Sequence, residues 1–318
     1  MKGLTDIPGI LVGHATDRDA VTGCTAILCP QGATAGADVR GSATGTSQLD
    51  LLSPMHLNAK VHGICLSGGS AFGLEAAAGV VRFLESKGHG FPTGAGVVPL
   101  VPAAILFDLG VARKGVRPGR EMGHRAAEAA TGDAVAEGSV GAGTGATVGK
   151  LYGVANAMKS GIGSATVWLD GPCAGIRVAA LAAVNAYGDV LDPESGHILA
   201  GARTSPEGRE FANMAYQIKR GARGGFRGGN TTLVVVATNA RLSKIEANKL
   251  AQFGSLGVAR TISPVWTTSD GDLTFALSLG EDRADLTALG VAAAEAVAAA
   301  VQRSVRMAES LGGVPGLR

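Results

Sequence analysis

Aromatic residues and net charge are both scarce in this chain. Phe, Trp and Tyr together make up 4% of the 318 residues, and the formal net charge is +2. So small a charge provides no basic surface for a phosphate backbone, and aromatic residues do not alternate with basic ones as single-strand binding requires. We therefore expect no nucleic-acid partner.

Cysteine and membrane-spanning segments are scarce as well. The four cysteines are Cys24, Cys29, Cys65 and Cys173, and none forms a C-x-x-C pair. Neither Cys nor His occurs at the spacing of zinc ligands, so we expect buried, reduced thiols and no metal. The N-terminus has no signal-peptide core, and no apolar run reaches the ~20 residues that span a bilayer. The sequence therefore predicts a soluble, cytoplasmic protein with no membrane partner.

Small and aliphatic residues are abundant instead. Hydrophobic residues make up 46% of the chain, and 49 residues are glycine. A core built from Ala, Val, Leu and Ile requires closely packed backbones. The length allows one large domain or two ordinary ones, and no Pro- or Ser-rich linker marks a boundary.

Hydrophobic periodicity predicts helices and strands interspersed along the chain. The stretch at 176–187 has the pattern of a strand, although it is also Ala-rich enough for a helix. The composition changes abruptly only in the Gly/Arg-rich loop at 220–230. Strands are predicted at 25–29, 63–66, 164–169, 176–187, 231–238 and 274–279, and helices at 70–87, 121–131, 203–220, 243–253 and 285–311.

The Gly/Arg-rich loop runs directly into an apolar strand, and Thr231 and Thr232 stand at the junction. Gly-Gly-Asn before a β run is ordinarily just a turn into a strand. A hydroxyl held where a loop meets a buried strand is also well placed to attack the peptide bond before it. If the Asn230–Thr231 bond is cut, Thr231 gains a free α-amine that can serve as the general base for its own hydroxyl.

Two other segments carry candidate polar groups. Ser269-Asp-Gly-Asp places Asp270 and Asp272 two residues apart, just before a strand. The ordinary interpretation is a turn with Asp capping, and the functional one is an acid pair that orients the nucleophile and its amine. Asn185 ends an apolar run, where its amide N–H could stabilise an oxyanion, although an Asn there is more often a turn residue. His14 and His62 have no visible partner.

Two Gly-rich motifs are weaker candidates. The segment from Gly141 to Ala146 matches the G-x-G-x-x-[GA] pattern of dinucleotide sites, but no convincing strand precedes it and no ribose-binding acid follows. The favoured interpretation of this segment is a tight turn, and the second is a supporting active-site role for Lys150. A nucleotide-binding oxidoreductase is the alternative from another class of function. Ser67-Gly-Gly-Ser-Ala-Phe-Gly breaks the nucleophile-elbow pattern at Phe72 and is interpreted as a helix N-terminus facing a ligand or a loop.

Taken in order, the motifs of this chain resemble those of the L-aminopeptidase/D-esterase family, which includes β-aminopeptidases and nylon-oligomer (6-aminohexanoate oligomer) hydrolases. The resemblance runs nearly end to end. Most of the motifs are weak singly, but their order is specific. They are Thr5-Asp-Ile-Pro-Gly-Ile, Gly23-Cys-Thr, Asp38-Val-Arg-Gly, Leu66-Ser-Gly-Gly-Ser-Ala-Phe-Gly-Leu, Phe91-Pro-Thr-Gly-Ala-Gly-Val-Val-Pro, Gly143-Thr-Gly-Ala-Thr-Val-Gly-Lys and Gly229-Asn-Thr-Thr-Leu-Val-Val-Val-Ala.

The resemblance implies an α/β (α+β) fold, a four-layer αββα sandwich similar to the N-terminal-nucleophile hydrolases with different connectivity. It implies a single domain over 1–318 that cuts itself into a 1–230 α chain and a 231–318 β chain, which assemble as a tetramer of αβ units. It implies hydrolysis of a small-molecule amide, peptide or oligomer, or of an ester, through an acyl-enzyme and without a cofactor or metal. An acyltransferase of the same fold style is the alternative.

The family pattern also assigns roles to residues at the junction. Thr231 matches the nucleophile, and Asn230 matches the residue before the cut. Phe107 stands where some members carry Tyr, so no hydroxyl is expected from that position. The resemblance further implies that Asp270 and Asp272 are the acidic pair beside the nucleophile, that Asn185 is the oxyanion amide and that Lys150 is an active-site lysine.

Overall fold

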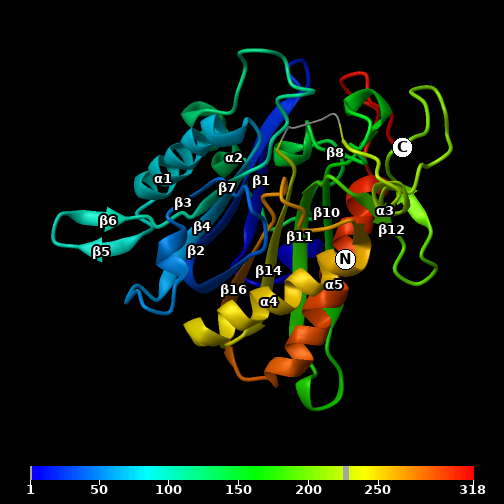
Figure 1. Cartoon of the computed structure of the whole chain (residues 1–318). Helices are drawn as coiled ribbons and strands as arrows, with labels where there is room; N and C mark the ends of the chain where they lie inside the picture. Colours follow the sequence, from blue (N-terminus) through cyan, green and yellow to red (C-terminus); the bar gives the residue numbers. More distant parts are fainter. Residues whose placement is uncertain (1, 225–228) are drawn as a thin grey trace.

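The computed structural model describes residues 2–224 and 229–318, and its framework is a large mixed sheet (Figure 1). Its nine strands are β1 (Leu11–Asp17), β2 (Thr22–Val39), β3 (Thr46–Ser47), β4 (Lys60–Ser67), β7 (Ala103–Ile105), β10 (Ile162–Trp168), β11 (Arg177–Asn185), β14 (Thr231–Ala240) and β16 (Leu273–Asp282). Their spatial order is β10-β11-β14-β16-β2-β4-β7-β3, with β1 paired to β2. The sheet therefore contains strands from both sides of the Asn230–Thr231 bond.

Shorter strands and five α-helices complete the part of the fold that the structure describes. The short strands are β5 (Phe91–Thr93), β6 (Gly96–Val98), β8 (Thr147–Val148), β9 (Met158–Lys159), β12 (Asp189–Leu191), β13 (Ile198–Ala200) and β15 (Ile262–Ser263). The helices are α1 (Ala76–Ser86), α2 (Arg120–Glu128), α3 (Met214–Lys219), α4 (Lys244–Thr261) and α5 (Leu286–Arg306). Because α4 lies between the parallel neighbours β14 and β16 in sequence, it provides the crossover that parallel pairing needs.

The long strand β2 joins two halves of the sheet. One half consists of β10, β11, β14 and β16, and the other consists of β1, β4, β7 and β3. Its first part pairs with β1 and β4, and its last part pairs with β16. Its pairing with β4 shifts register between Leu28 and Ala33, an irregularity of the kind that bends a strand. One apolar cluster contains Leu233 and Phe275 together with Leu66 and Leu106, so the two halves pack face to face.

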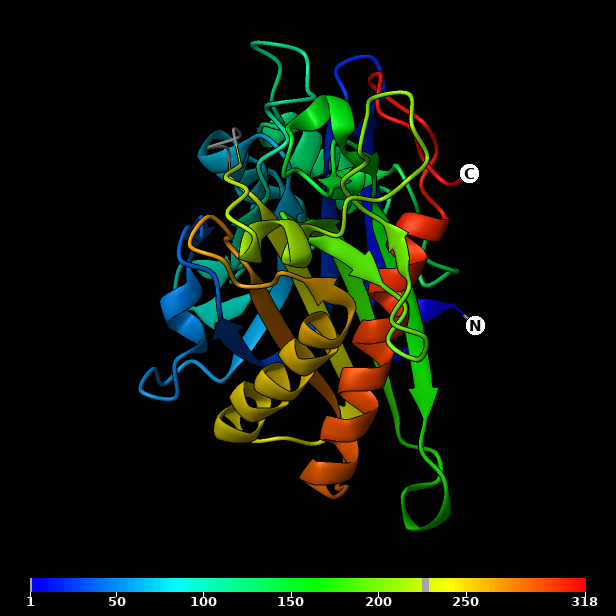
Figure 2. The same cartoon turned by 45° about the vertical axis from the view of Figure 1, so that its right-hand side comes forward.

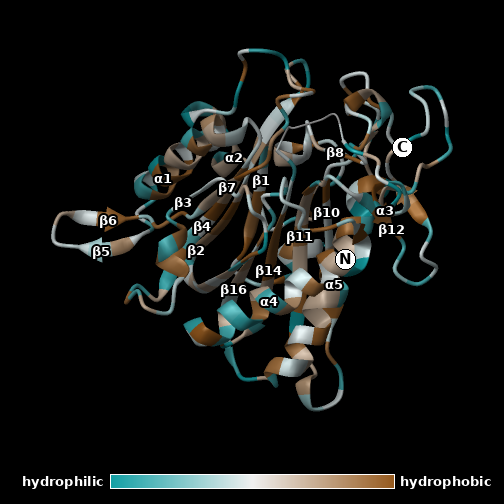
Figure 3. Cartoon of the chain, in the orientation of Figure 1, coloured by the Kyte–Doolittle hydropathy of each residue, from teal (hydrophilic) through white to brown (hydrophobic). Residues whose placement is uncertain are grey.

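The helices cover the two outer faces of this folded sheet. In β14, Leu233 and Val235 face the cluster between the halves, whereas Val234 and Val236 face α4 and α5, as the two-residue period of a strand requires. On the other side, α1 and α2 cover β1, β2 and β4 (Figures 1 and 2). Figure 3 shows the strands mostly hydrophobic and the helices two-sided. The result is the helix–sheet–sheet–helix layering that the resemblance implies.

Helix α5 differs from one sequence expectation. It is 21 residues long and, by length and composition, apolar enough to cross a bilayer, whereas we expected no such segment. However, 67% of its most apolar window is buried within the protein, where it packs against β10 and β11. Burial on a sheet is the ordinary reason for a helix to be apolar around most of its circumference.

Most predicted elements are present, and one is wrong. The Ala-rich stretch at 176–187 is the interior strand β11, where small side chains allow α5 to approach closely. Only Met214–Lys219 of the predicted helix at 203–220 is helical. The guanidinium of Arg203 donates to the carbonyl oxygens of Ala155 and Ala157, and these contacts hold the start of the segment as a loop. Tertiary hydrogen bonds therefore override the local helical pattern there.

The two histidines have partners that the sequence does not show, and three of the four thiols are buried as expected. His14 and His62 do have partners: His14 Nδ1 lies 2.9 Å from the Thr25 hydroxyl, and His62 Nδ1 accepts from the backbone N–H of Leu100 at 3.2 Å. These partners are distant in sequence, so no local pattern signals them. All four cysteines are free; three are buried, and Cys173 is partly exposed.

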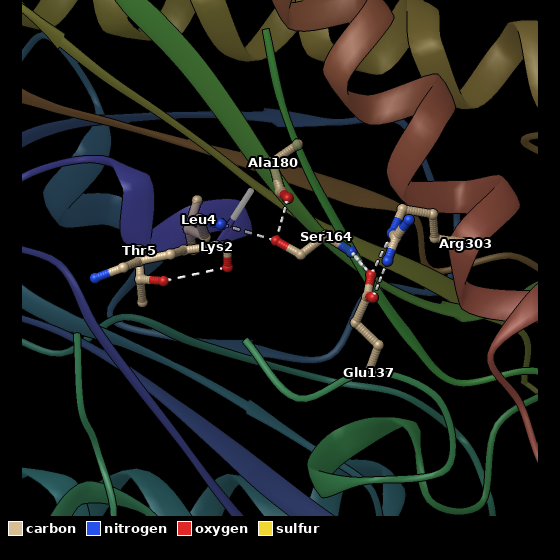
Figure 4. Close-up of polar contacts among 7 residues, drawn as sticks. All are labelled: Lys2, Leu4, Thr5, Glu137, Ser164, Ala180 and Arg303. Atoms are coloured by element: carbon tan, nitrogen blue, oxygen red, sulfur yellow. Dashed lines mark hydrogen bonds and ion pairs between the residues drawn. The ribbon is translucent and has the colours of Figure 1, made fainter. Parts of the chain in front are cut away.

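Ser164 of β10 ties the N-terminal turn to the sheet and to α5 (Figure 4). Its hydroxyl accepts from the backbone N–H of Leu4 at 2.8 Å and donates to the carbonyl of Ala180 at 2.7 Å. Its own backbone N–H donates to the carboxylate of Glu137 at 2.8 Å, and the Arg303 guanidinium donates to the same carboxylate. The Glu137 carboxylate thus accepts hydrogen bonds from both the strand β10 and the helix α5.

We expect Glu137→Ala to destabilise the fold, because it leaves the Ser164 N–H and the Arg303 guanidinium without their acceptor. The loss should be ~1–3 kcal/mol in the free energy of unfolding, measured by denaturant titration. Glu309→Ala is the matched control, since the Arg18–Glu309 pair is exposed and should contribute at most ~1 kcal/mol. Equal losses for the two variants would contradict this account of the network.

Candidate active site

The Asn230–Thr231 bond lies buried at the start of β14, between the end of β11 and the segment that leads into β16. β14 begins at Thr231, where the sequence predicts the junction of loop and strand. Thr231 pairs with Asn185 of β11, and Asn230 forms a parallel bridge with Asp270 just before β16. Asn230 is 0% exposed and Thr231 is 3% exposed. The two flanking strands therefore bring Asn185 and Asp270 to this bond from opposite sides.

Two donors converge on the carbonyl oxygen of Asn230. The Thr231 hydroxyl donates to it at 2.6 Å, and the backbone N–H of Gly271 donates to it at 2.6 Å. A fixed backbone N–H on a carbonyl oxygen stabilises the negative charge that develops there when a nucleophile adds. The Asn230 carbonyl is thus polarised, and the Thr231 hydroxyl lies directly beside it.

Position 271 has no room for a side chain. A Cβ on Gly271 would lie 2.8 Å from Thr231 Oγ1 and 2.7 Å from the carbonyl oxygen of Ala43. Only a residue without a side chain therefore lets the 271 N–H approach the Asn230 carbonyl. The sequence predicts a role for the two acids on either side but not for this glycine. The one available signal is its place between Asp270 and Asp272.

The two carboxylates differ in their hydrogen bonds. Asp270 Oδ2 accepts from both the backbone N–H and the hydroxyl of Thr267 at 2.7 Å, while its Oδ1 is buried without a hydrogen-bond partner among the described residues. Asp272 Oδ1 accepts from the backbone N–H of Thr232 at 2.6 Å. Burial, followed by the nearby Asp270 carboxylate, raises the pKa of Asp272 well above its ordinary value. Asp272 therefore holds a proton more readily near neutral pH than an ordinary carboxyl does.

Lys150 and Asn185 form the other side of the site. The Lys150 ammonium is buried and donates to Asn185 Oδ1 at 2.8 Å and to the Asn185 carbonyl at 2.9 Å. Burial lowers the pKa of Lys150 to about 7, although Asp270 and Asp272 oppose this shift. The lysine consequently exchanges a proton near neutral pH, which is the range that a general base needs.

A cavity of about 730 Å³ opens beside the buried bond. Gly229 belongs to its wall, as do Thr267, which holds Asp270, and Ser269, whose carbonyl accepts from the Asn230 N–H. Its apolar wall includes Ala43, Tyr187, Ile218 and Pro264, and Arg223 is the charged residue among the described residues that line it. A mostly apolar cavity with a few polar groups is the usual form of a small-molecule site.

Comparison with protein families decides to which class the chain belongs. The model of peptidase family S58 matches residues 2–318. The chain belongs to peptidase family S58. As an S58 peptidase, it is an amide-bond hydrolase.

Relatives of this S58 peptidase carry two kinds of name. An uncharacterized aminopeptidase of Mycobacterium tuberculosis (strain ATCC 25618 / H37Rv) is 38% identical, over 100% of this chain and 97% of the relative. The 6-aminohexanoate-oligomer endohydrolase of Paenarthrobacter ureafaciens is 32% identical, over 87% of this chain and 74% of the relative. Exopeptidase and endohydrolase names therefore both occur among the relatives.

Solved structures similar to this S58 peptidase show its fold. A Burkholderia sp. β-aminopeptidase superimposes with a TM-score of 0.71 at 23% identity, covering 100% of this chain and 91% of the other. The L-aminopeptidase D-Ala-esterase/amidase of Ochrobactrum anthropi, described as a variant of the Ntn-hydrolase fold, gives 0.74 at 19% identity, covering 99% and 88%. The predicted fold class is confirmed.

The structure of this S58 peptidase also locates the remaining sequence candidates. The backbone carbonyl of Phe107 accepts from Asn185 Nδ2 at 2.9 Å, so position 107 does lie at the site. The stretch that begins at Gly141 is a buried turn followed by the strand β8, whereas a dinucleotide motif opens a helix. This geometry agrees with the tight-turn interpretation and removes the basis for an oxidoreductase.

Proposed function

We propose that this S58 peptidase cuts its own Asn230–Thr231 bond and then hydrolyses amides with Thr231 as an N-terminal nucleophile. The observation that carries the proposal is the pair of 2.6 Å contacts that the Thr231 hydroxyl and the Gly271 N–H make with the Asn230 carbonyl oxygen. Nucleophile, electrophile and oxyanion donor are thereby assembled in the uncut chain.

In the first step, Thr231 Oγ1 adds to the carbonyl carbon of Asn230. The C–N bond then breaks as the nitrogen, which keeps its own hydrogen, takes up the proton that the hydroxyl lost, so that a primary amine forms and an ester joins Asn230 to the Thr231 oxygen. Water hydrolyses the ester and leaves a carboxylate on Asn230. Lys150 is the candidate base for the hydroxyl proton, because its pKa is lowered to about 7 and it is bonded to Asn185, the strand partner of Thr231.

In the mature enzyme, the new α-amine of Thr231 takes over as the base. Such an amine has an ordinary pKa of ~7.7–8.0, so a useful fraction is neutral at physiological pH. The free Oδ1 of Asp270 is a candidate acceptor for this amine, because Asp270 bridges to Asn230 in the adjacent strand and Oδ1 is buried without a bond among the described residues. Asp272, bonded to the next backbone N–H, would hold the start of β14 in place.

The cavity beside the bond is proposed to hold the acyl part of the substrate. The hydroxyl attacks the substrate amide, the amine leaves with a proton, and water then releases the acyl group from Thr231. Peptides and ω-amino acid oligomers both offer secondary amides with apolar carbons beside them, which an apolar wall such as Tyr187, Ile218 and Pro264 would accommodate. The relatives named aminopeptidase and 6-aminohexanoate-oligomer endohydrolase support this range of substrates.

Trapping the acyl-enzyme tests this mechanism. An activated ester of a short linear acid is mixed with the enzyme, and the reaction is quenched in acid within the first turnover. Intact mass should show the acyl group on the 231–318 fragment only. Acylation of the 1–230 fragment, or turnover with no trapped adduct at any quench time, would contradict Thr231 as the nucleophile.

The lowered pKa of Lys150 predicts how self-cleavage depends on pH. Only the neutral amine accepts a proton, and its fraction falls as the pH drops below about 7. We therefore expect the cleavage rate to fall about tenfold per pH unit below that value and to level off above it. The measurement is a gel time course after precursor made by cell-free synthesis at pH 5.5 is shifted to higher pH.

Two results would remove Lys150 from this role. The first is a cleavage rate that stays constant between pH 5.5 and 8. The second is a Lys150→Met variant that cleaves at the wild-type rate, since loss of a general base typically costs ~10²–10⁴-fold.

A further inference from the structure

Two buried ionisable groups behind the active site take no part in the proposed chemistry. Asp108 is 1% exposed and Lys159 is 0% exposed. Burial raises the pKa of Asp108 and lowers the pKa of Lys159 to about 7, and in each case the opposite charge of the other residue opposes the shift. Buried charged groups are costly, so their contacts indicate what they hold in place.

Asp108 fixes one of the segments that contact Asn185. Its Oδ2 accepts from the Thr22 hydroxyl at 2.6 Å, and its Oδ1 accepts from the backbone N–H of Gly69 at 2.7 Å. The preceding residue is Phe107, whose carbonyl accepts from Asn185 Nδ2 at 2.9 Å. The Ser67-Gly-Gly-Ser motif, interpreted from sequence as facing a ligand or a loop, therefore faces this carboxylate.

Lys159 fixes the other segment. Its ammonium donates to the carbonyl oxygens of Thr144 and Ala146 at 2.8 and 2.7 Å. The next residue is Thr147, whose backbone N–H donates to Asn185 Oδ1 at 3.1 Å. The Gly-rich turn thus owes its position to a buried ammonium, and its end reaches the oxygen of the Asn185 amide.

The two segments also touch each other. A Cβ on Gly145 would lie 2.6 Å from the Cβ of Asp108 and 2.9 Å from its Oδ2. The glycine therefore allows the turn held by Lys159 to pack directly on the carboxylate. A shift of either segment would move the donor or the acceptor that orients Asn185.

We infer that Asp108 and Lys159 are positioning residues that set which way the side-chain amide of Asn185 faces. An amide has an oxygen end and a nitrogen end, and only its partners decide between the two orientations. Here Oδ1 accepts from the Thr147 N–H of one segment, in addition to the Lys150 ammonium, and Nδ2 donates to the Phe107 carbonyl of the other segment. Nδ2 keeps a second hydrogen, which is available to an oxyanion formed at Thr231, the strand partner of Asn185.

This inference rests on the proposed function, because it gives Asn185 the role of an oxyanion donor. Removal of one such donor costs ~10²–10³ in kcat. A misoriented amide should therefore lower kcat on an amide substrate by up to that factor and leave KM within about twofold, since the acyl cavity is not altered.

The test is a double-mutant cycle between positions 108 and 185 in cleaved, purified enzyme. Asp108→Asn keeps the size and removes the charge, while Asn185→Ala removes the amide. If Asp108 acts through Asn185, each single variant lowers kcat, and Asp108→Asn has no further effect in the Asn185→Ala background. Multiplying effects in the double variant, or a wild-type kcat for Asp108→Asn, would overturn the inference.

A milder pair of variants covers the case in which Asp108→Asn fails to fold. Thr22→Val removes only the hydroxyl that donates to Asp108 and should lower kcat about tenfold without changing KM. Thr166→Val is its matched control, because the buried Thr166 hydroxyl donates to the carboxylate of Asp6 at 2.8 Å, away from the site. Equal kcat values for the two variants would overturn the inference.

Lys159→Met should give the same split between kcat and KM as Asp108→Asn, since it releases the turn that ends at Thr147. Intact mass of every sample shows whether the chain is cut, and so distinguishes failure of the proposed function from failure of the positioning role. Active wild-type enzyme that is uncut would overturn the proposed function. Cleaved Asp108 and Lys159 variants with wild-type kcat would overturn only the positioning role.

Discussion

Thr231→Ala gives a single uncut chain on a denaturing gel and no amide hydrolysis. The reason is that one hydroxyl serves both reactions: it lies 2.6 Å from the Asn230 carbonyl oxygen in the precursor and becomes the N-terminal nucleophile after the cut. Without it, neither the ester intermediate nor the acyl-enzyme can form. Two chains of normal size from this variant would contradict the assignment.

Two further variants isolate the hydroxyl as the cause. Thr231→Ser keeps a hydroxyl on the same carbon and should still be cleaved and active. Thr232→Val is the matched control at the adjacent position, because it has nearly the same shape and the Thr232 hydroxyl is buried without a partner among the described residues. Its backbone N–H still donates to Asp272, so cleavage should proceed normally. A block at position 232 rather than 231 would move the nucleophile by one residue.

Gly271→Ala should slow self-cleavage by ~10²–10³-fold, the typical cost of losing one oxyanion donor. The added methyl group would lie 2.8 Å from Thr231 Oγ1, closer than real Cβ contacts allow. The strand end must shift to relieve this contact, and the N–H then moves away from the Asn230 carbonyl. A time course of cleavage during cell-free synthesis measures the effect.

Gly94→Ala is the control for this glycine. Gly94 lies between β5 and β6, and nothing is within 4 Å of the position that its Cβ would take. That variant should be cleaved at the wild-type rate. If Gly271→Ala were also cleaved at the wild-type rate, the Gly271 N–H would not be the donor that matters.

The sequence predicts the start of β14 well because its signal is local. A Gly-rich loop, an Asn and two Thr precede an apolar run, and the observed strand begins at Thr231. The alternation of Leu233, Val234, Val235 and Val236 between two faces follows from the same strand period. Local patterns of this kind survive in the fold because burial reinforces them.

Contacts between distant segments explain what the sequence does not predict. The approach of Gly271 to Asn230 depends on the parallel pairing of β14 and β16, which no local pattern encodes. The partners of Asp108 come from β2 and from the turn after β4. The false helix at 203–220 fails for the same reason, because Arg203 bonds to the carbonyls of Ala155 and Ala157 in a distant segment.

N-terminal sequencing of fully active enzyme, together with its intact mass, tests the central claim most directly. We predict two N-termini in equal amounts, one at the start of the chain and one reading Thr-Thr-Leu-Val-Val-Val. Fully active material that gives only the first N-terminus and the mass of the whole chain would contradict it.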